Sequence, residues 1–136
     1  RAKVTCVACH DAHGSQNRYQ MVKQDVNNDL CLTCHGKRFP NPDAVRKHTR
    51  HSYAPETTGT SRCSSCHMVK TASSAEAGDI HSHDFKIIKP AASLAEFKKD
   101  PKTVAPNSCN GCHKDWGKSE EGYAAGVQAY DKLFKK

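Results

Sequence analysis

The chain has 136 residues, enough for one small domain, but it is poor in the residues that build a core. Hydrophobic residues make up only 36% of it, and no stretch approaches the roughly 18 apolar residues that a membrane-spanning helix needs. The formal net charge is +7, yet no run of Lys and Arg is interleaved with aromatic residues, which argues against nucleic-acid binding. Because 8 Cys and 9 His stand out against this background, we expect disulfides, metal or a covalent cofactor to supplement packing.

All eight Cys belong to Cys-x-x-Cys pairs, and a His directly follows each pair. The pairs and their His are Cys6/Cys9 with His10, Cys31/Cys34 with His35, Cys63/Cys66 with His67, and Cys109/Cys112 with His113. This pattern is the attachment signature of c-type haem. Two thiols three positions apart reach the two vinyl groups of one porphyrin, and the imidazole that follows binds the iron. The sequence therefore predicts four covalently bound haem c groups.

Two other uses of paired cysteines explain the sequence less well. Four Cys-x-x-Cys pairs could form two Cys₄ zinc sites in a structural module. An even number of Cys is also typical of a disulfide scaffold. Neither alternative gives a reason for the His that follows every pair.

Five histidines remain after the four proximal ones: His13, His48, His51, His81 and His83. Four irons need four distal ligands, so His can close both faces of every iron. This favours electron transfer over catalysis, because a haem enzyme keeps one iron position open for substrate. Without a potential-raising Met ligand, we expect low midpoint potentials.

The expected elements follow the motifs along the chain. His13 is too near His10 to reach the opposite face of the same ring, so it should bind a neighbouring haem. Asn41-Pro42 predicts a helix start, and a helix through 44–50 would place His48 and His51 on one face. If the segment 81–83 is extended, at most one of its two His faces a given iron.

Secondary structure should be sparse. We expect a mostly irregular and α-helical fold of a single tetrahaem domain, with few short helices and little or no sheet. Its expected parts are a haem-pair module at about 1–40, a second pair at about 41–118, and a C-terminal helix at about 119–134. A shorter helix is expected near 91–99 and at most a strand at 85–88. Loops rich in Gly, Ser, Thr, Asn and Pro are expected at 11–17, 36–42, 55–65 and 100–108.

The last helix is the most clearly predicted element. Ser119 is a typical N-cap, and the acidic residues at 120 and 121 suit the positive end of the helix. Tyr123, Val127, Tyr130 and Phe134 form one apolar stripe. We expect this stripe to pack against a haem edge, with a binding site for a partner helix as the alternative.

The motifs also resemble a known family. The sequence CVACHDAHGS at 6–15, followed by LCLTCH at 30–35, resembles the doubled C-x-x-C-H module of bacterial multihaem cytochromes c. The stretches CSSCHMVKT at 63–71, GDIHSHDF at 78–85 and PNSCNGCH at 106–113 resemble a second multihaem pattern. Together these segments cover most of residues 6–116. The family pattern has Pro after Cys-His-Met, where this chain has Val69.

The resemblance implies particular distal ligands and several possible roles. In similar sequences the His before the Asp-Phe step is a distal ligand, which selects His83 over His81, and the stretch before the third motif supplies His48 and His51. The family includes soluble periplasmic carriers, electron-entry modules, and extracellular cytochromes that polymerise into haem-lined filaments. Some filament subunits carry four haems and exchange a ligating His.

The expected function is electron transfer along a close-spaced chain of bis-His haems, without enzymatic activity. The two variants are a subunit of an extracellular filament and a discrete periplasmic carrier that docks to a reductase. The expected partners are redox proteins, extracellular acceptors or further copies of the chain. Covalent haem attachment takes place outside the cytoplasm, so the chain is interpreted as an exported protein without its leader, or a fragment. An enzyme with an open haem is the weaker alternative.

Overall fold

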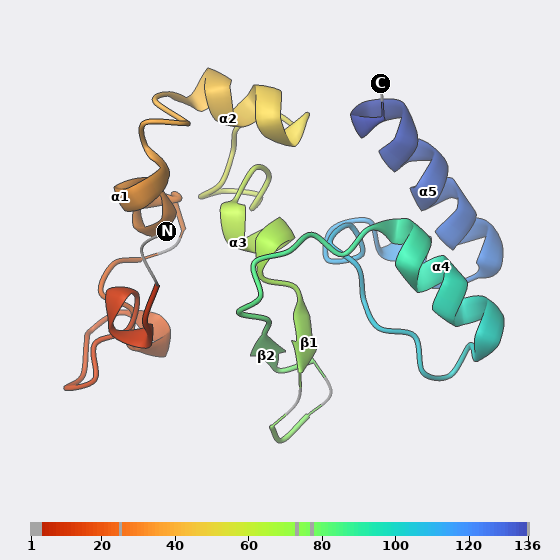
Figure 1. Ribbon diagram of the computed structural model, residues 1–136, viewed down its shortest axis with the longest axis horizontal. Helices are drawn as coiled ribbons and strands as arrows, with labels where there is room; N and C mark the ends of the chain where they lie inside the picture. Colours follow the sequence, from red (N-terminus) through yellow and green to blue (C-terminus); the bar gives the residue numbers. More distant parts are fainter. Residues whose placement is uncertain (1–3, 25, 73, 77, 136) are drawn as a thin grey trace. The chain divides into compact units, whose positions relative to one another are not determined.

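A computed structural model describes residues 4–24, 26–72, 74–76 and 78–135, which form two compact units divided after Cys63. The described chain is largely irregular, with short helices and one two-stranded sheet (Figure 1). This confirms the predicted fold class. Among the described residues, no helix combines the length and the apolar character needed to traverse a bilayer.

The first unit contains the 3₁₀ turns η1 (Cys6–Ala8) and η2 (Arg18–Gln20) and the helices α1 (Asp29–His35) and α2 (Pro42–Thr49). The predicted start of α2 is confirmed, because the Asn41 side chain accepts a hydrogen bond from the backbone N–H of Ala44 at 2.9 Å.

The expectation that one helix presents both His48 and His51 is wrong. Helix α2 ends at Thr49 because Arg50 adopts a left-handed conformation with φ 59°. His51 therefore lies beyond the helix, while His48 lies in its last turn.

Helix α3 (Cys63–His67) begins at the boundary, and the second unit continues with β1 (Lys70–Ala72) and β2 (Ile80–His81). The two strands pair antiparallel, with Lys70 opposite His81. The strand expected at 85–88 is wrong: this segment is irregular, and its first residue, Phe85, has a left-handed φ of 55° that an extended strand does not allow.

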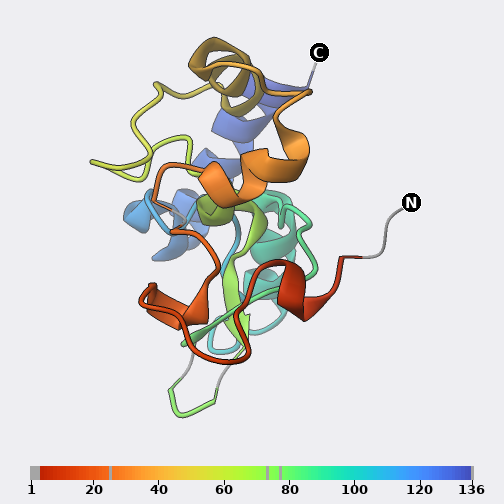
Figure 2. The same ribbon diagram turned by 90° about the vertical axis from the view of Figure 1, so that its left-hand side faces the viewer.

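Helices α4 (Pro90–Lys99) and α5 (Glu120–Phe134) lie side by side in the second unit, and η3 (Lys114–Gly117) precedes α5 (Figures 1 and 2). The predicted cap of α5 is confirmed, since the Ser119 hydroxyl accepts the N–H of Gly122 at 3.2 Å. Within the apolar stripe, Tyr123 is 5% exposed and packs against Phe97 of α4, with the two ring centroids 5.2 Å apart. At the end of the stripe, Phe134 stays exposed.

Few apolar side chains are buried in the described part of the chain. The buried hydrophobic side chains there are Val45 and Tyr123, whereas Asn28, Ser93 and Asn107 are almost completely buried. Ser93 donates to the carbonyl of Ala105 at 2.8 Å. Hydrogen bonds by polar side chains therefore fix much of this fold, in keeping with the low hydrophobic content.

Candidate haem-binding sites

The first motif forms a tight turn that a returning segment closes. Just after η1, the N–H of His10 donates to the carbonyl of Cys6 at 2.8 Å. The N–H of Val22 donates to the carbonyl of Cys9 at 2.9 Å. The His10 Nδ1 lies 3.0 Å from the carbonyl oxygen of Tyr19. Because a carbonyl only accepts, Nδ1 carries the hydrogen, and in the neutral ring Nε2 keeps its lone pair for a metal.

The second motif lies on α1, which carries Cys31, Cys34 and His35. The turn after this helix is held by the N–H of Phe39, which donates to the carbonyl of His35 at 3.0 Å. The Phe39 ring in turn lies 4.9 Å from the His48 ring. The structure thus brings one predicted distal ligand to the turn that follows the second motif.

The third motif, on α3, repeats the histidine arrangement of the first. The Nδ1 of His67 donates to the carbonyl of Phe85 at 2.9 Å, which again fixes the tautomer that leaves Nε2 for iron. The partner carbonyl lies 18 residues away in the sequence. Two of the four predicted proximal His therefore show the outer hydrogen bond that metal-binding His residues almost always make.

The fourth motif is organised by Asn107, whose side chain is 1% exposed. Its Oδ1 accepts the N–H groups of Cys109 at 2.9 Å and Asn110 at 3.2 Å. The N–H of His113 donates to the carbonyl of Cys109 at 2.9 Å, so the segment from the first Cys of the motif to its His forms one hydrogen-bonded turn. The pKa of the Cys109 thiol is raised to about 11, mainly by burial and to a smaller extent by the nearby Cys66 and Cys112 thiols.

Hydrogen bonds join neighbouring motifs. In the first unit, Asn28 receives the N–H of Cys63 at 2.8 Å and donates to the carbonyl of Ser61 at 2.9 Å. In the second unit, the Ser108 hydroxyl donates to the carbonyl of Cys66 at 2.7 Å. Sequence reasoning missed Asn28, Asn107 and Ser108; the only signal was a polar residue one to three positions before a motif.

The remaining histidines differ in how they are held. Asp11 accepts the backbone N–H of His13 at 2.9 Å, and the His13 side chain is exposed. His51 Nδ1 donates to the carbonyl of Thr49, and His81 Nδ1 to the carbonyl of Met68, both at 2.6 Å. The His83 ring lies edge-on to the Phe85 ring at 6.3 Å. The distal roles of His13, His48, His51 and His83 stay predictions.

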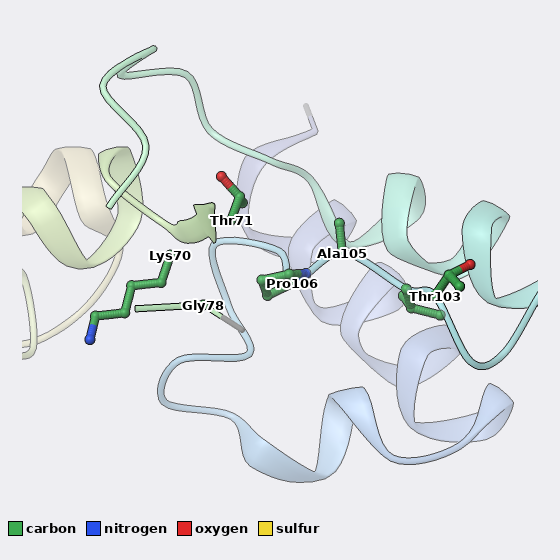
Figure 3. Close-up of a pocket in the computed structure, with 7 residues that line it drawn as sticks. Lys70, Thr71, Gly78, Thr103, Ala105 and Pro106 are labelled. Carbon is green, nitrogen blue, oxygen red and sulfur yellow. The ribbon is translucent and has the colours of Figure 1, made fainter. Parts of the chain in front are cut away.

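The described residues show no cluster of three His, Cys, Asp or Glu side chains placed to hold one metal ion. They do show a hollow of about 390 Å³ in the second unit (Figure 3). Its wall includes Lys70, Thr71, Gly78, Thr103, Ala105 and Pro106. None of the predicted haem ligands lines this hollow, so the four motifs remain the candidate cofactor sites.

The residues of the motifs fit haem c. None of the eight Cys, all in the described part of the chain, forms a disulfide. Each pair is followed by an imidazole on the same turn, and the tautomer of His10 and His67 suits iron. Thiols for two thioethers and a nitrogen ligand are the donor set that haem c requires.

Comparison with protein-family models matched residues 1–39 to the family described as the doubled CXXCH motif. Comparisons with curated proteins and with solved structures found no match. The family match covers the first two motifs and supports the interpretation from their spacing. Residues 1–39 resemble a module of multihaem c-type cytochromes, in which the Cys pairs bind haem c covalently for electron transfer.

Proposed function

We propose that the whole chain is a tetrahaem electron-transfer protein in which two imidazoles bind each iron. Each bound haem would supply an iron that changes between the ferric and ferrous states. The chain attaches the haems through its eight Cys, orients the proximal ligands His10, His35, His67 and His113, and sets the spacing of the motifs.

One observation carries this proposal: backbone carbonyls fix the rings of His10 and His67 through Nδ1. This bond sets the tautomer, limits rotation of the ring and makes Nε2 a stronger ligand. In a zinc ribbon or a disulfide scaffold, the residue after each Cys pair would need no such bond. The repetition at two separate motifs therefore supports iron ligation as their shared role.

The hydrogen bonds between motifs support transfer along a chain of haems. Asn28 ties the segment before the second motif to the first Cys of the third. Ser108 ties the fourth motif to the last Cys of the third. Cofactors attached to motifs that touch in this way would be held close together, as electron transfer through the protein requires.

Intact mass and spectroscopy of the protein from its native source test the proposal. We expect the polypeptide mass plus four haems, and low-spin iron spectra that neither cyanide nor CO changes. The double variant Cys31→Ser/Cys34→Ser should lose the mass of one haem, and Cys109→Ser/Cys112→Ser likewise. Bare polypeptide, or stoichiometric zinc in a colourless protein, would overturn the proposal; high-spin iron that binds CO would favour an enzyme.

Exposed apolar side chains around the first motif favour assembly of the chain into a filament. Val4, Val7 and Tyr19 are 70%, 66% and 54% exposed, although they flank Cys6 and the carbonyl that holds His10. A second copy of the chain could cover them and the haem there, which would extend the electron path between subunits. We therefore propose an extracellular filament subunit, with a discrete periplasmic carrier as the alternative.

Electron microscopy of the native preparation separates the two roles. Filaments with haems stacked across subunit boundaries would support the first, and dispersed monomers would support the carrier. Val7→Glu should disperse filaments, because it places a charge in the covered surface. The matched control Val22→Glu changes a less exposed side chain beside the same motif.

A further inference from the structure

The sole Trp of the chain lies flat against one of the proximal histidines. The rings of His113 and Trp116 are stacked, with centroids 3.9 Å apart and planes 7° apart. The backbone supports this arrangement, because the N–H of Trp116 donates to the carbonyl of His113 at 3.1 Å. Stacked rings with this backbone link restrict rotation of the imidazole about its side-chain bonds.

Helix α5 holds Trp116 in place through two glycines one turn apart. A Cβ at Gly126 would lie 3.2 Å from Cε3 of Trp116, and 3.4 Å from its Cβ. A Cβ at Gly122 would overlap the carbonyl oxygen of Asp115, at 2.3 Å. Only residues without a side chain allow η3 to lie this close to α5. The indole therefore packs on a rigid helix as well as on the imidazole.

We propose that Trp116 is a positioning residue for the iron ligand His113. Held by α5, it fixes the plane of the imidazole and so sets the electronic properties of the haem at the fourth motif. The inference rests on the proposed function, in which His113 binds iron. The groups around a metal ligand orient it and tune the metal, and carbonyls do this for His10 and His67. At His113 the stacked ring of Trp116 supplies a restraint of this kind.

Three variants of the haem-loaded protein test this role by electron paramagnetic resonance and spectroelectrochemistry. Trp116→Leu should change one of the four low-spin signals and shift one midpoint potential, leaving the other three. Trp116→Phe keeps an aromatic ring, so its low-spin signal and its midpoint potential should stay close to those of the unmodified protein. Phe97→Leu is the matched control, because the Phe97 ring, on α4, packs against Tyr123 of α5 and so changes a different contact of the helix on which Trp116 packs. It should lower stability and leave all four signals unchanged.

A milder variant leaves both rings in place. Gly126→Ala pushes its new methyl group against the indole and should move the same signal as Trp116→Leu, by a smaller amount. The inference is overturned if Trp116→Leu and Gly126→Ala leave every signal unchanged, or if Phe97→Leu produces the same change. Haem content of the unmodified protein separates the two proposals. Fewer than four haems contradicts the proposed function, whereas four haems with no effect of Trp116 contradicts this inference alone.

Discussion

Asn28 bonds to Cys63 across 35 residues of sequence, and in doing so connects the second haem-attachment motif to the third. Its Oδ1 accepts the Cys63 N–H at 2.8 Å, while its Nδ2 donates to the carbonyl of Ser61 at 2.9 Å. The side chain is completely buried, so water does not compete for these bonds. One amide therefore fixes where the third motif begins relative to α1.

Replacing this amide should destabilise the protein. Asn28→Ala removes its bonds to the Cys63 N–H and the Ser61 carbonyl, and losing a hydrogen bond to a buried polar group costs about 1–3 kcal/mol. Chemical denaturation followed by circular dichroism measures the loss. Asn27→Ala is the control, because within the described residues Asn27 makes local bonds, to Asp29. Equal losses in the two variants would contradict the connecting role of Asn28.

Ser108 has the corresponding role between the third and fourth motifs. Its hydroxyl donates to the Cys66 carbonyl at 2.7 Å and accepts the N–H of Ile88 at 3.0 Å. We expect Ser108→Ala to cost about 1–3 kcal/mol, since two part-buried backbone groups each lose a hydrogen bond to this hydroxyl. Denaturation of Ser82→Ala gives the baseline, because that hydroxyl makes a local bond at 3.3 Å. A loss for Ser108→Ala no larger than this baseline would show that the bond is dispensable.

Asp79 holds residues 74–76, which lie between β1 and β2 in the sequence. Hydrogen bonds from the Ser74 hydroxyl and from the N–H groups of Ala75 and Ser74 hold the pKa of its carboxyl well below the ordinary 3.8. A lowered folded-state pKa means that this carboxylate stabilises the conformation of residues 74–76 fully above about pH 4 and ceases to do so as pH falls through the lowered value.

Asp79→Ala should therefore speed amide exchange at Ser74 and Ala75 near neutral pH, and the difference from the unmodified protein should shrink in strong acid. Hydrogen exchange followed by nuclear magnetic resonance measures both effects. Asp84→Ala, which removes an exposed ion pair with Lys86, should leave these amides unchanged. Protection that is independent of residue 79 at neutral pH would refute the role of this carboxylate.

Helices α2, α4 and α5 could be predicted because their signals are local. Asn41 before Pro42, Pro90 at the start of α4, and Ser119 as a cap all lie within one turn of the element that they begin. The hairpin could not be predicted in the same way. Its strands have three and two residues, too few to show alternation, and the residues 74–76 between them are held by hydrogen bonds to the Asp79 side chain.

In the candidate sites, too, local features could be predicted from the sequence and long-range contacts could not. Spacing alone predicts the Cys pairs and the His that follow them as haem sites, because haem attachment imposes that spacing. The groups that orient those histidines could not be inferred. Two are backbone carbonyls, of Tyr19 and Phe85, which any residue supplies and only the fold brings near. The third, Trp116, depends on glycines in a later helix.

The pair His81 and His83 offers a direct test of distal ligation. If the protein is the proposed tetrahaem cytochrome, His83→Ala should leave one iron without its second imidazole, so that one of the four haems becomes high-spin and binds CO, as its absorption spectrum would show. His81→Ala should keep all four haems low-spin. It should weaken the hairpin instead, since the ring of His81 bonds to the Met68 carbonyl at 2.6 Å. The opposite pattern, with high-spin iron in His81→Ala alone, would make His81 the ligand, because its Nδ1 bond also leaves Nε2 suited to iron.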